Sequence, residues 1–334
     1  MHASRVLFVA AEAAAALFFL PLWRFWSASP PAYRWSIVLG DGAQRRLQAL
    51  GALAGLPVDA VMDRRSGEIA TILQHRRLSL LMSSAGDRLP LEVAAVRMAR
   101  ERGARTVQVI DTWYNYSRRF EGVEAGALPD QIAVIDQAAR SEAIAEGLPG
   151  DRLVVVGHPW WEQVRPRRKQ VPQDRVLLLG APILRDYGNK LGYDENSIAD
   201  VVISAMKEAP QLFRVVWYGP HPEQTIMPVQ ASGFDLVRDG SSVIASAGTV
   251  LGAFSAPMVD AYLAGANVIS VQPGDSPKDL CPLSRHGRVP RVRNPQGLIQ
   301  ALQEGSQINP EGMRSMLRGS TKRLVKVVED SLGV

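Results

Sequence analysis

Residues able to bind sugars or phosphates recur just after apolar runs of the chain. One such run is followed by residues 111–120, DTWYNYSRRF, which combine a carboxylate, an amide, aromatic rings and two arginines. Aromatic rings stack on the faces of sugars and bases, and Asp111 and Asn115 are able to hydrogen-bond hydroxyl groups. The segment therefore predicts either a ligand platform or a packed loop in which Trp113 and Tyr116 fill the edge of the core.

Two histidines stand in turns that end other apolar runs. His158 lies in the segment 157–159, GHP, and His221 lies in the segment 219–222, GPHP. The prolines on both sides of His221 stiffen its turn. An imidazole fixed at such a place is suited to bind a phosphate or to protonate a leaving group. A purely structural turn is the alternative at both positions.

A third candidate is the segment 254–265, FSAPMVDAYLAG, which predicts the end of a strand, a turn and a helix. Ser255 would cap this helix, followed by Ala256 and by a proline suited to the first turn. The free backbone amides and the helix dipole at such a position favour an anion. Asp260, expected in the first turn, would accept hydrogen bonds from sugar or ribose hydroxyls, or would simply stabilise the dipole.

Motifs of several cofactor-dependent enzyme classes are absent from the sequence. Residues 40–42, GDG, do not make the GxGxxG fingerprint of dinucleotide enzymes, and the chain has no Walker lysine loop. No HExxH or paired-histidine spacing indicates a metal, and the single Cys281 excludes an internal disulfide and a cysteine cluster. We therefore expect neither a cofactor nor a bound metal.

The apolar runs themselves predict the elements that would position these residues. The runs are continuous rather than alternating, which is typical of parallel strands buried on both faces. Helical spacing of apolar residues at 44–53, 91–102 and 197–209 indicates strand–helix repetition, and hence an α/β fold with two doubly wound parallel sheets. The predicted strands are 5–10, 35–39, 78–82, 106–110, 132–135 and 153–156 in the first half, and 176–179, 214–218, 249–254 and 267–271 in the second.

Chain length and composition agree with two domains. With 334 residues, of which 46% are hydrophobic, the chain is long enough for two globular cores. Residues 162–174 are polar and basic with two prolines, which is a linker composition. We predict Rossmann-like domains at 1–165 and 166–310, followed by an amphipathic helix at 311–334 that has the option of crossing back to the first domain.

The charge and the first apolar stretch bear on partners. The net charge is +5, with basic runs such as 165–169, which suit solvated faces or a surface that binds nucleotide phosphates or acidic lipid heads. No recognised motif accompanies the charge, so nucleic acid is not an expected partner. The stretch 11–21 is too short to span a membrane and predicts a buried first helix, with interfacial membrane contact through Leu20, Trp23 and Trp26 as the alternative.

Several of these segments resemble GT-B enzymes. Residues 129–130, PD, and 154–159, VVVGHP, are similar to lipid-A-disaccharide synthase and its relatives. Segment 255–265 resembles the donor-site helix of GT-B glycosyltransferases and of the related UDP-N-acetylglucosamine 2-epimerases. Segment 220–222, PHP, resembles the His-Pro motif with which bacterial GT-B sialyltransferases hold the phosphate of a CMP-sugar. The resemblance rests on short motifs spread over nearly the whole chain, and it implies two Rossmann-like domains facing a cleft.

The resemblance also implies an activity. It indicates a metal-independent glycosyltransferase that moves a sugar from a UDP- or CMP-sugar to a cell-surface glycan, lipid or protein. Such an enzyme would lie in the cytoplasm or at the inner face of the cytoplasmic membrane. Asp87 or Asp111 would be the catalytic base, and His221 would stabilise the leaving group. The nucleotide sugar would lie near Gly180, His221, Ser255, Ala256 and Asp260, and the acceptor near Glu12, Ser84, Trp113, Asn115 and His158.

Two alternatives use the same fold. One is a nucleotide-sugar 2-epimerase or hydrolase, which needs no acceptor, and the sparse Asp, Glu and His residues of the first half stand against it. The other is a non-catalytic scaffold. It is favoured by residues 11–14, AEAA, which replace the glycine-rich loop that GT-B enzymes usually carry after the first strand.

Overall fold

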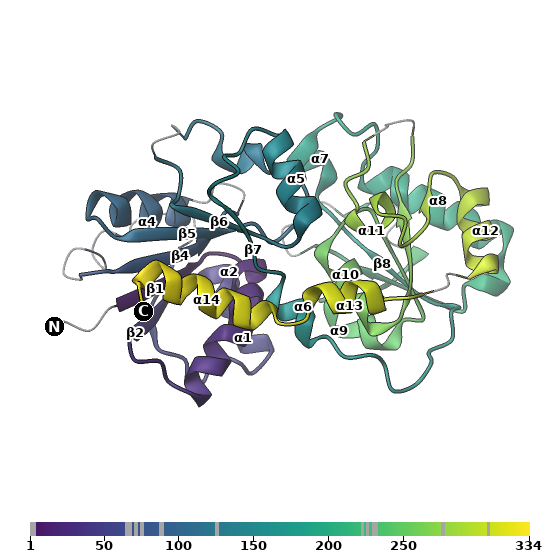
Figure 1. The fold of residues 1–334 in the computed structure, drawn as a ribbon. Coiled ribbons are helices and arrows are strands. Elements are labelled where there is room, and N and C mark those ends of the chain that lie inside the picture. Colours follow the sequence, from purple (N-terminus) through teal and green to yellow (C-terminus); the bar gives the residue numbers. More distant parts are fainter. Residues whose placement is uncertain are drawn as a thin grey trace. The chain divides into compact units, whose positions relative to one another are not determined.

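The chain is organised as two compact units, each built around its own parallel sheet (Figure 1). Unit 1 comprises Met1–Gln163 and Ser315–Val334, and unit 2 comprises Val164–Arg314. The predicted fold class, α/β with two doubly wound parallel sheets, is therefore confirmed. The structure is a computed structural model and describes residues 5–63, 69, 73, 77–86, 90–123, 127–221, 224, 227–228, 233–274, 278–305 and 308–334.

Unit 1 contains a seven-stranded sheet in the order β3-β2-β1-β4-β5-β6-β7, with parallel neighbours throughout. The chain starts in the middle and winds outward in both directions, as in other doubly wound folds. Strand β3 is not among the predicted strands, because its residues alternate between half-buried and exposed instead of forming an apolar run. The strands are β1 Arg5–Ala10, β2 Arg34–Gly40, β3 Val58–Met62, β4 Leu80–Ser84, β5 Arg105–Val109, β6 Gln131–Val134 and β7 Leu153–Val155.

Helices cover both faces of the sheet of unit 1. Alternation along β1 shows the division, because Phe8 packs with α1 and α14 whereas Leu7 and Val9 pack with α4. The core is therefore two apolar layers, one on each side of the central strands. The helices are α1 Ala13–Ala28, α2 Asp41–Ala49, α4 Pro90–Glu101, the short 3-10 helix η1 Ser117–Phe120, α5 Gln137–Ala145, α6 Pro159–Gln163 and α14 Ser320–Leu332.

Helix α1 supplies the aromatic part of this core. The ring of Phe8 makes edge-to-face contacts with Phe19, Trp23 and Trp26, at centroid distances of 5.2, 5.7 and 5.6 Å. Leu20, Trp23 and Trp26 are buried, which confirms the predicted buried helix and removes these side chains from any membrane-contact surface. Within the described ranges, no helix combines the length and apolar character needed to cross a membrane.

Unit 2 contains a six-stranded parallel sheet in the order β10-β9-β8-β11-β12-β13. Leu179 of β8 pairs in register with Gly219 of β9, and Leu178 pairs with Leu251 of β11. The carboxyl ends of β9, β8 and β11 therefore lie side by side. The strands are β8 Arg175–Leu179, β9 Val215–Gly219, β10 Asp235–Leu236, β11 Thr249–Gly252, β12 Asn267–Val271 and β13 Arg291–Val292.

The helices of unit 2 follow its strands. They are α7 Ile183–Tyr187, α8 Glu195–Glu208, the 3-10 helices η3 Pro210–Leu212 and η5 Ile244–Ser246, α9 Gly240–Val243, α10 Ala256–Ala264, α11 Pro282–Arg285 and α12 Pro295–Glu304. Helix α8 begins with a capping box in which Asp194 and Ser197 each bind the other's backbone amide. Helix α10 ends at Gly265, whose φ of 86° lies in the left-handed region that glycine adopts without strain.

The C-terminal segment is two helices rather than the single amphipathic helix that the sequence predicts. Helix α13, Glu311–Leu317, ends shortly before Gly319, and α14 begins at Ser320. Gly319 has a φ of 79°, which breaks the helical path. Helix α14 then packs on the core of unit 1 through Leu324 and Val328.

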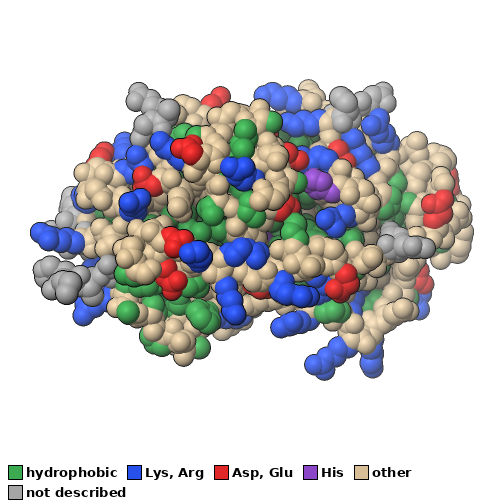
Figure 2. Space-filling view, in the orientation of Figure 1, with side chains coloured by type: hydrophobic (Ala, Val, Ile, Leu, Met, Phe, Trp, Pro, Cys, Tyr) green, Lys and Arg blue, Asp and Glu red, His purple; other side chains and the backbone are tan. Residues whose placement is uncertain are grey.

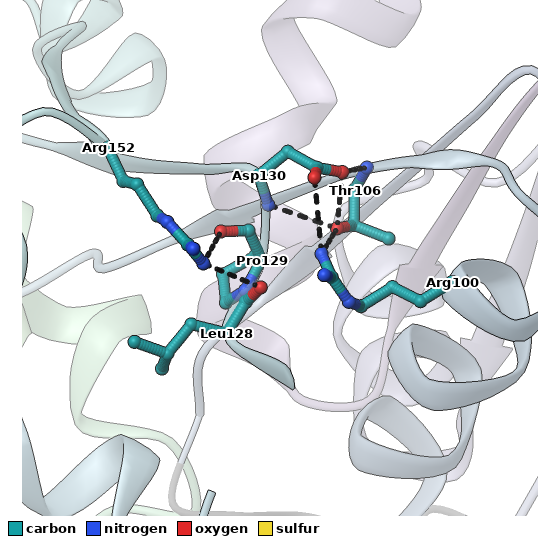
Figure 3. Close-up of polar contacts among 6 residues, drawn as sticks. All are labelled: Arg100, Thr106, Leu128, Pro129, Asp130 and Arg152. Carbon is teal, nitrogen blue, oxygen red and sulfur yellow. Dashed lines mark hydrogen bonds and ion pairs between the residues drawn. The ribbon is translucent and has the colours of Figure 1, made fainter. Parts of the chain in front are cut away.

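The 129–130 segment braces the amino edge of the sheet of unit 1 (Figure 3). The carboxylate of Asp130 accepts hydrogen bonds from the amide and the hydroxyl of Thr106, at 2.8 and 3.0 Å, and from Arg100 of α4, at 3.2 Å. Arg152 donates to the carbonyl oxygens of the two residues before Asp130, at 3.1 and 3.3 Å. These contacts lie where β5 and β6 begin, so this motif is structural and sits away from the carboxyl edge, where parallel sheets bind ligands.

The surface charge is mixed on the face drawn in Figure 2. Lys and Arg side chains lie among Asp and Glu side chains there, without merging into one basic patch. Some exposed basic residues pair along their own helix, as Arg45 does with Asp41 at 2.8 Å and Lys326 with Asp330 at 3.0 Å. These paired basic residues therefore behave as solvated surface.

Candidate functional site

The carboxyl edge of the sheet of unit 2 brings glycines together on adjacent strands. Gly180 follows β8, Gly219 ends β9 and Gly252 ends β11. The amide of Gly180 donates to the carbonyl oxygen of Gly219 at 2.8 Å. A Cβ atom at Gly219 would lie 2.5 Å from the Cα atom of Gly240, which is closer than packed atoms approach. The three glycines are buried, so at this edge neighbouring protein atoms pack directly against the backbone.

Helix α10 begins at the same edge. Its N-cap residue, Ser255, is extended, but the Oγ atom caps no amide and is buried without a hydrogen-bond partner in the described part of the chain. Ala256, the first helical residue, is exposed. The amides and the positive dipole end at this position favour an anion. Asp260 is the fifth residue of the helix, so it lies beyond the first turn, where the sequence placed it, but on the same face as Ala256.

A glutamine holds the turn that carries His221. The Oε1 atom of Gln224 accepts hydrogen bonds from the Tyr218 hydroxyl at 3.0 Å and from the His221 amide at 3.3 Å. The backbone amide of Gln224 donates in turn to the His221 carbonyl oxygen at 2.8 Å. Burial raises the pKa of Tyr218 to about 12, so its hydroxyl stays a neutral donor. These contacts fix the His221 backbone at the end of β9, whereas Pro222, on which the predicted stiffness partly rests, lies outside the described residues.

A buried polar network that the sequence analysis missed lies behind this edge. Gln272, just after β12, donates to the Ser270 hydroxyl at 2.8 Å and to Asp279 at 2.6 Å, and it accepts from the Tyr193 hydroxyl at 3.3 Å. Asp279 also accepts from the Cys281 amide at 2.9 Å. Burial raises the pKa of both the Tyr193 hydroxyl and the Cys281 thiol, so both are neutral. No local sequence pattern marks a network of this kind, because its members come from separate segments.

In unit 1, three side chains from three elements hold the loop after β4. The hydroxyl of Ser84 donates to Glu92 of α4 at 2.7 Å. Gln108 of β5 donates to the carbonyl oxygen of Ser84 at 3.1 Å, and Arg119 of η1 donates to the carbonyl oxygen of Ala85. Only Ser84 was a candidate on sequence grounds. The loop after β4 is therefore held by contacts from α4, β5 and η1.

Glu92 is a fully buried acid, with 2% of its surface exposed. Its Oε1 atom accepts from the Ala11 amide at 3.2 Å as well as from Ser84, so it links the loops after β1 and β4. Burial raises its pKa from 4.5 to about 8, against the hydrogen bonds from Ser84, Ala11 and Gly86, which lower it. The charge of Glu12 raises it further. Glu92 is therefore mostly protonated at neutral pH.

Asp111 lies at the carboxyl end of β5 beside Arg119. Burial raises the pKa of this carboxyl group, and the nearby Arg119 guanidinium opposes that effect. Arg119 also donates to the Thr112 hydroxyl at 2.7 Å, which holds the guanidinium in place. A carboxyl group of raised proton affinity beside a fixed cation is an environment in which an acid can serve as a base.

The aromatic loop after β5 is packed rather than presented to solvent. Trp113 is 2% exposed, its Nε1 atom donates to Asp136 at 2.8 Å, and its ring stacks on Trp161 at a centroid distance of 5.1 Å. Tyr116 is buried, and its hydroxyl donates to Glu142 of α5 at 2.9 Å. These contacts favour the packed-loop interpretation for both rings.

His158 lies in the core of unit 1. Its imidazole stacks on Trp161 at 3.7 Å between centroids and meets Phe18 edge-on at 4.9 Å. Its amide donates to the Ser320 hydroxyl at 3.1 Å, and its Nδ1 atom accepts from the Trp161 amide at 3.4 Å. Burial lowers the pKa of His158 to about 3, so the ring is neutral at physiological pH. These contacts favour a structural turn over an imidazole that binds phosphate.

The structure groups the remaining candidates of unit 1 at one edge. Glu12, Ser84 and Asp111 follow the adjacent strands β1, β4 and β5, and Asn115 lies in the loop beyond Asp111. Glu12 and Asn115 are partly exposed, and Asn115 has a φ of 58°, which is unusual for a residue other than glycine. Asp87 lies outside the described residues. Among the side chains that are described, no three of His, Cys, Asp or Glu are grouped as a metal would require.

The candidates of unit 2 also share one edge. Gly180, His221 and Ser255 follow three adjacent strands, and Ala256 and Asp260 continue from Ser255 into α10. This arrangement is that of a site for an anion held by backbone amides. The role of each of these residues stays a prediction.

Comparison with known proteins finds solved structures of the same fold but no similar sequence family. No protein-family model and no curated protein sequence matches the chain. Solved structures do match it over nearly its whole length. The UDP-N-acetylglucosamine 2-epimerase of Rickettsia bellii has a TM-score of 0.69 at 8% identity, with 99% of this chain and 98% of that chain covered.

Two further solved structures contain ligands. The UDP-N-acetylglucosamine 2-epimerase of Neisseria meningitidis, bound to UDP-N-acetylglucosamine, has a TM-score of 0.61 at 13% identity, with 98% and 100% of the two chains covered. An Anabaena protein in complex with UDP and glucose has a TM-score of 0.62 at 11% identity, with 99% and 100% covered. Identities this low show a shared fold. The chain therefore has the two-unit α/β fold of these proteins, which confirms the fold implied by its resemblance to GT-B enzymes.

Proposed function

We propose that this chain is an enzyme that binds a UDP-sugar through the carboxyl edge of unit 2 and acts on the sugar. The observation that carries the proposal is the convergence of glycine backbone, the N-terminus of α10 and the braced His221 turn on three adjacent strands. Helix N-termini and close backbone at strand ends bind phosphates in α/β folds. The UDP and UDP-N-acetylglucosamine held by similarly folded proteins support UDP as the nucleotide.

Each group at this edge would have its own part in holding the nucleotide. The amides at Ser255 and Ala256 would meet phosphate oxygens, and Gly180 would leave room for the Tyr218 and Gln224 side chains that brace the His221 turn. His221 would donate to the phosphate nearest the sugar, and Asp260 would accept from ribose hydroxyls. Because the leaving diphosphate gains charge as its bond to the sugar breaks, donors fixed in advance would stabilise the transition state more than the bound substrate.

Conversion of the UDP-sugar without an acceptor, by 2-epimerisation or hydrolysis, is the chemistry best supported. Its support is the likeness in fold to UDP-N-acetylglucosamine 2-epimerases over nearly the whole chain. Such chemistry needs a group that takes a proton from the sugar or from water. Asp111, a buried carboxyl group of raised pKa beside Arg119, is the group of unit 1 that we assign to this step.

Transfer of the sugar to a glycan or lipid is the second candidate. It is favoured by the partly exposed Glu12 and Asn115 at the edge that also carries Asp111, since these side chains would bind the hydroxyls of an acceptor. Asp111 would then deprotonate the attacking hydroxyl. The two candidates share the nucleotide site and differ in whether turnover needs an acceptor.

One experiment separates them. The protein is incubated in deuterated water with UDP-N-acetylglucosamine, UDP-glucose or a CMP-sugar, with and without magnesium, and the products are followed by NMR. An epimer carrying deuterium at C2, or free UDP and sugar, supports conversion without an acceptor. Binding of a nucleotide sugar without turnover overturns conversion without an acceptor, and addition of a glycan or lipid acceptor then separates transfer from a non-catalytic scaffold. Absence of binding with all of them overturns both candidates. His221→Ala is compared with His286→Ala, an exposed histidine of the same unit, as the matched control.

A further inference from the structure

A buried carboxyl group lies beneath the edge of unit 1 where the sheet presents its candidate residues. Helix α4 packs Leu91 and Ala95 into the core and directs Glu92 toward the ends of β1 and β4. Glu92 there accepts hydrogen bonds from the residue before Glu12 and from the hydroxyl two residues before Gly86. Glu12 and Gly86 are partly exposed, so one buried side chain underlies two surface loops.

We infer that Glu92 is a positioning residue, which holds the loops after β1 and β4 in the arrangement that binds the sugar of the substrate. The inference rests on the proposed function. Glu92 itself does not reach a ligand, since its carboxyl group is fully buried. It acts through the Ala11 amide, which sets the position of Glu12, and through Ser84, which sets the start of the loop that leads to Gly86.

The hydrogen bonds are compatible with a protonated side chain. Both the Ala11 amide and the Ser84 hydroxyl donate to Oε1, and the Gly86 amide lies close enough to lower the pKa, while Oε2 makes no hydrogen bond of normal geometry in the described part of the chain. A proton on Oε2 leaves both bonds intact. Glutamine in place of Glu92 would keep them too, because its carbonyl oxygen accepts as Oε1 does. Leucine has a similar volume but accepts nothing, so it would release both loops.

The charges around Glu92 oppose its ionisation. Glu12 raises its pKa, and burial raises it to about 8. Asp41 is the first residue of α2, after Gly40, which approaches the Ala11 backbone so closely that a Cβ atom would be 2.2 Å from the Ala11 carbonyl oxygen. Asp41 is paired with Arg45.

The other charged groups near Glu92 do not favour its ionisation enough to cancel the effects of burial and of Glu12. The charge of Asp111 is partly offset by the nearby Arg119, which donates to the carbonyl oxygen of Ala85 in the β4 loop, and Asp87 lies outside the described residues. Loss of the Glu92 proton would therefore place a second negative charge below Glu12. Turnover of the wild type is expected to fall as pH rises through about 8.

The test compares Glu92→Gln, Glu92→Leu and a control, Glu101→Gln, which makes the same change at the exposed end of the same helix. For each, kcat and KM for UDP-N-acetylglucosamine are measured from pH 6 to 9.5, and amide hydrogen exchange is measured at Ala11 and Gly86. We expect kcat/KM at pH 7 to fall at least about tenfold in Glu92→Leu, with faster exchange at both amides. Glu92→Gln should stay within about threefold of the wild type and lose the alkaline fall.

Two results would overturn the inference: wild-type kcat/KM in Glu92→Leu, or an unchanged alkaline fall in Glu92→Gln. If Glu92→Leu does not fold, Ser84→Ala removes one of the two donors and replaces it in the comparison. If the wild type converts no UDP-sugar, the proposed function fails by itself. Amide hydrogen exchange then decides by itself. Faster exchange of the Ala11 amide in Glu92→Leu, which lacks the carboxyl oxygen, sustains the positioning role, and exchange equal to that of the wild type overturns it.

Discussion

The carboxyl edges of the two sheets differ in the groups that form them, which are backbone in unit 2 and ionisable side chains in unit 1. In unit 2 the edge is backbone: three glycines, the N-terminus of α10 and a turn braced by Gln224. In unit 1 the edge rests on ionisable side chains, namely the buried Glu92 and Asp111 and the partly buried Arg119. Backbone amides keep the same charge at every pH, whereas buried carboxyl groups do not. The first edge suits a diphosphate that is the same in every substrate, and the second suits proton chemistry.

The largest expected effect is on the pH dependence of stability, through Glu92. Its pKa is about 8 in the folded chain against an ordinary 4.5, so the folded state holds the proton more tightly. Its contribution is fully present below pH 4.5 and is lost as pH rises through about 8. The difference corresponds to at most about 5 kcal/mol of the free energy of unfolding. Thermal unfolding of wild type and Glu92→Gln at pH 5 and pH 9 should therefore show the variant gaining relative stability at the higher pH.

A matched variant decides whether the pH dependence of stability comes from Glu92. Glu101→Gln, at the exposed end of α4, should follow the wild type at both pH values. If Glu92→Gln also follows the wild type, Glu92 is ionised in the folded chain and the contrast between the two edges fails. Because the chain has two units, unfolding is best followed with a probe local to unit 1, such as hydrogen exchange in β1.

The next effect concerns the backbone-built edge of unit 2. His221→Ala should lower turnover of a UDP-sugar about 100-fold or more, because one fixed donor to the leaving diphosphate is lost. The melting temperature should change little, since Gln224 holds the turn through the backbone atoms of His221. Steady-state kinetics against the control His286→Ala measures this. Near-normal turnover in His221→Ala would remove this residue from the site.

Several features of this fold were predictable from local sequence. The run RVLFVA predicts β1 at 5–10, and the structure places β1 at Arg5–Ala10, because a central parallel strand must be apolar on both faces. The edge strand β3 was not predicted, because one of its faces is half-buried and the other is exposed, so it has no continuous apolar run. The two-residue strands β10 and β13 escaped because they are too short to leave a pattern.

The candidate sites divide in the same way. Residues at or shortly after the end of a strand, such as Ser84 and Ser255, are found by locating the strand end. Glu92 is not found that way, because an acid on an amphipathic helix looks like a solvent-facing residue until the helix is docked. The sequence left two interpretations of Trp113 open, a ligand platform and a packed loop, and the packing of Trp161 against its ring favours the packed loop. Long-range contacts of this kind have no local signature.

A smaller effect is expected at Asp260. Asp260→Asn keeps the shape of the side chain but weakens its hydrogen bonds to hydroxyl groups, so UDP should bind about tenfold less tightly, or about 1.4 kcal/mol. Calorimetric titration with UDP measures the change. Asp235→Asn, on the exposed edge strand β10, is the control for loss of one negative charge in the same unit. Equal affinities in all three proteins would mean that Asp260 serves α10 rather than the nucleotide.

The smallest effect tests whether the aromatic loop of unit 1 is packing or platform. Trp113→Phe keeps a ring against Trp161 but removes the Nε1 donor to Asp136, which still caps α5 through its other oxygen, bound to the Ala139 amide at 2.7 Å. A packed ring predicts a loss of about 1 kcal/mol in unfolding free energy with unchanged KM for a UDP-sugar. A platform predicts the reverse: KM rises severalfold while the melting temperature hardly moves. Measuring both on the same sample assigns the loop, because the loss of a buried hydrogen bond lowers stability without lowering affinity.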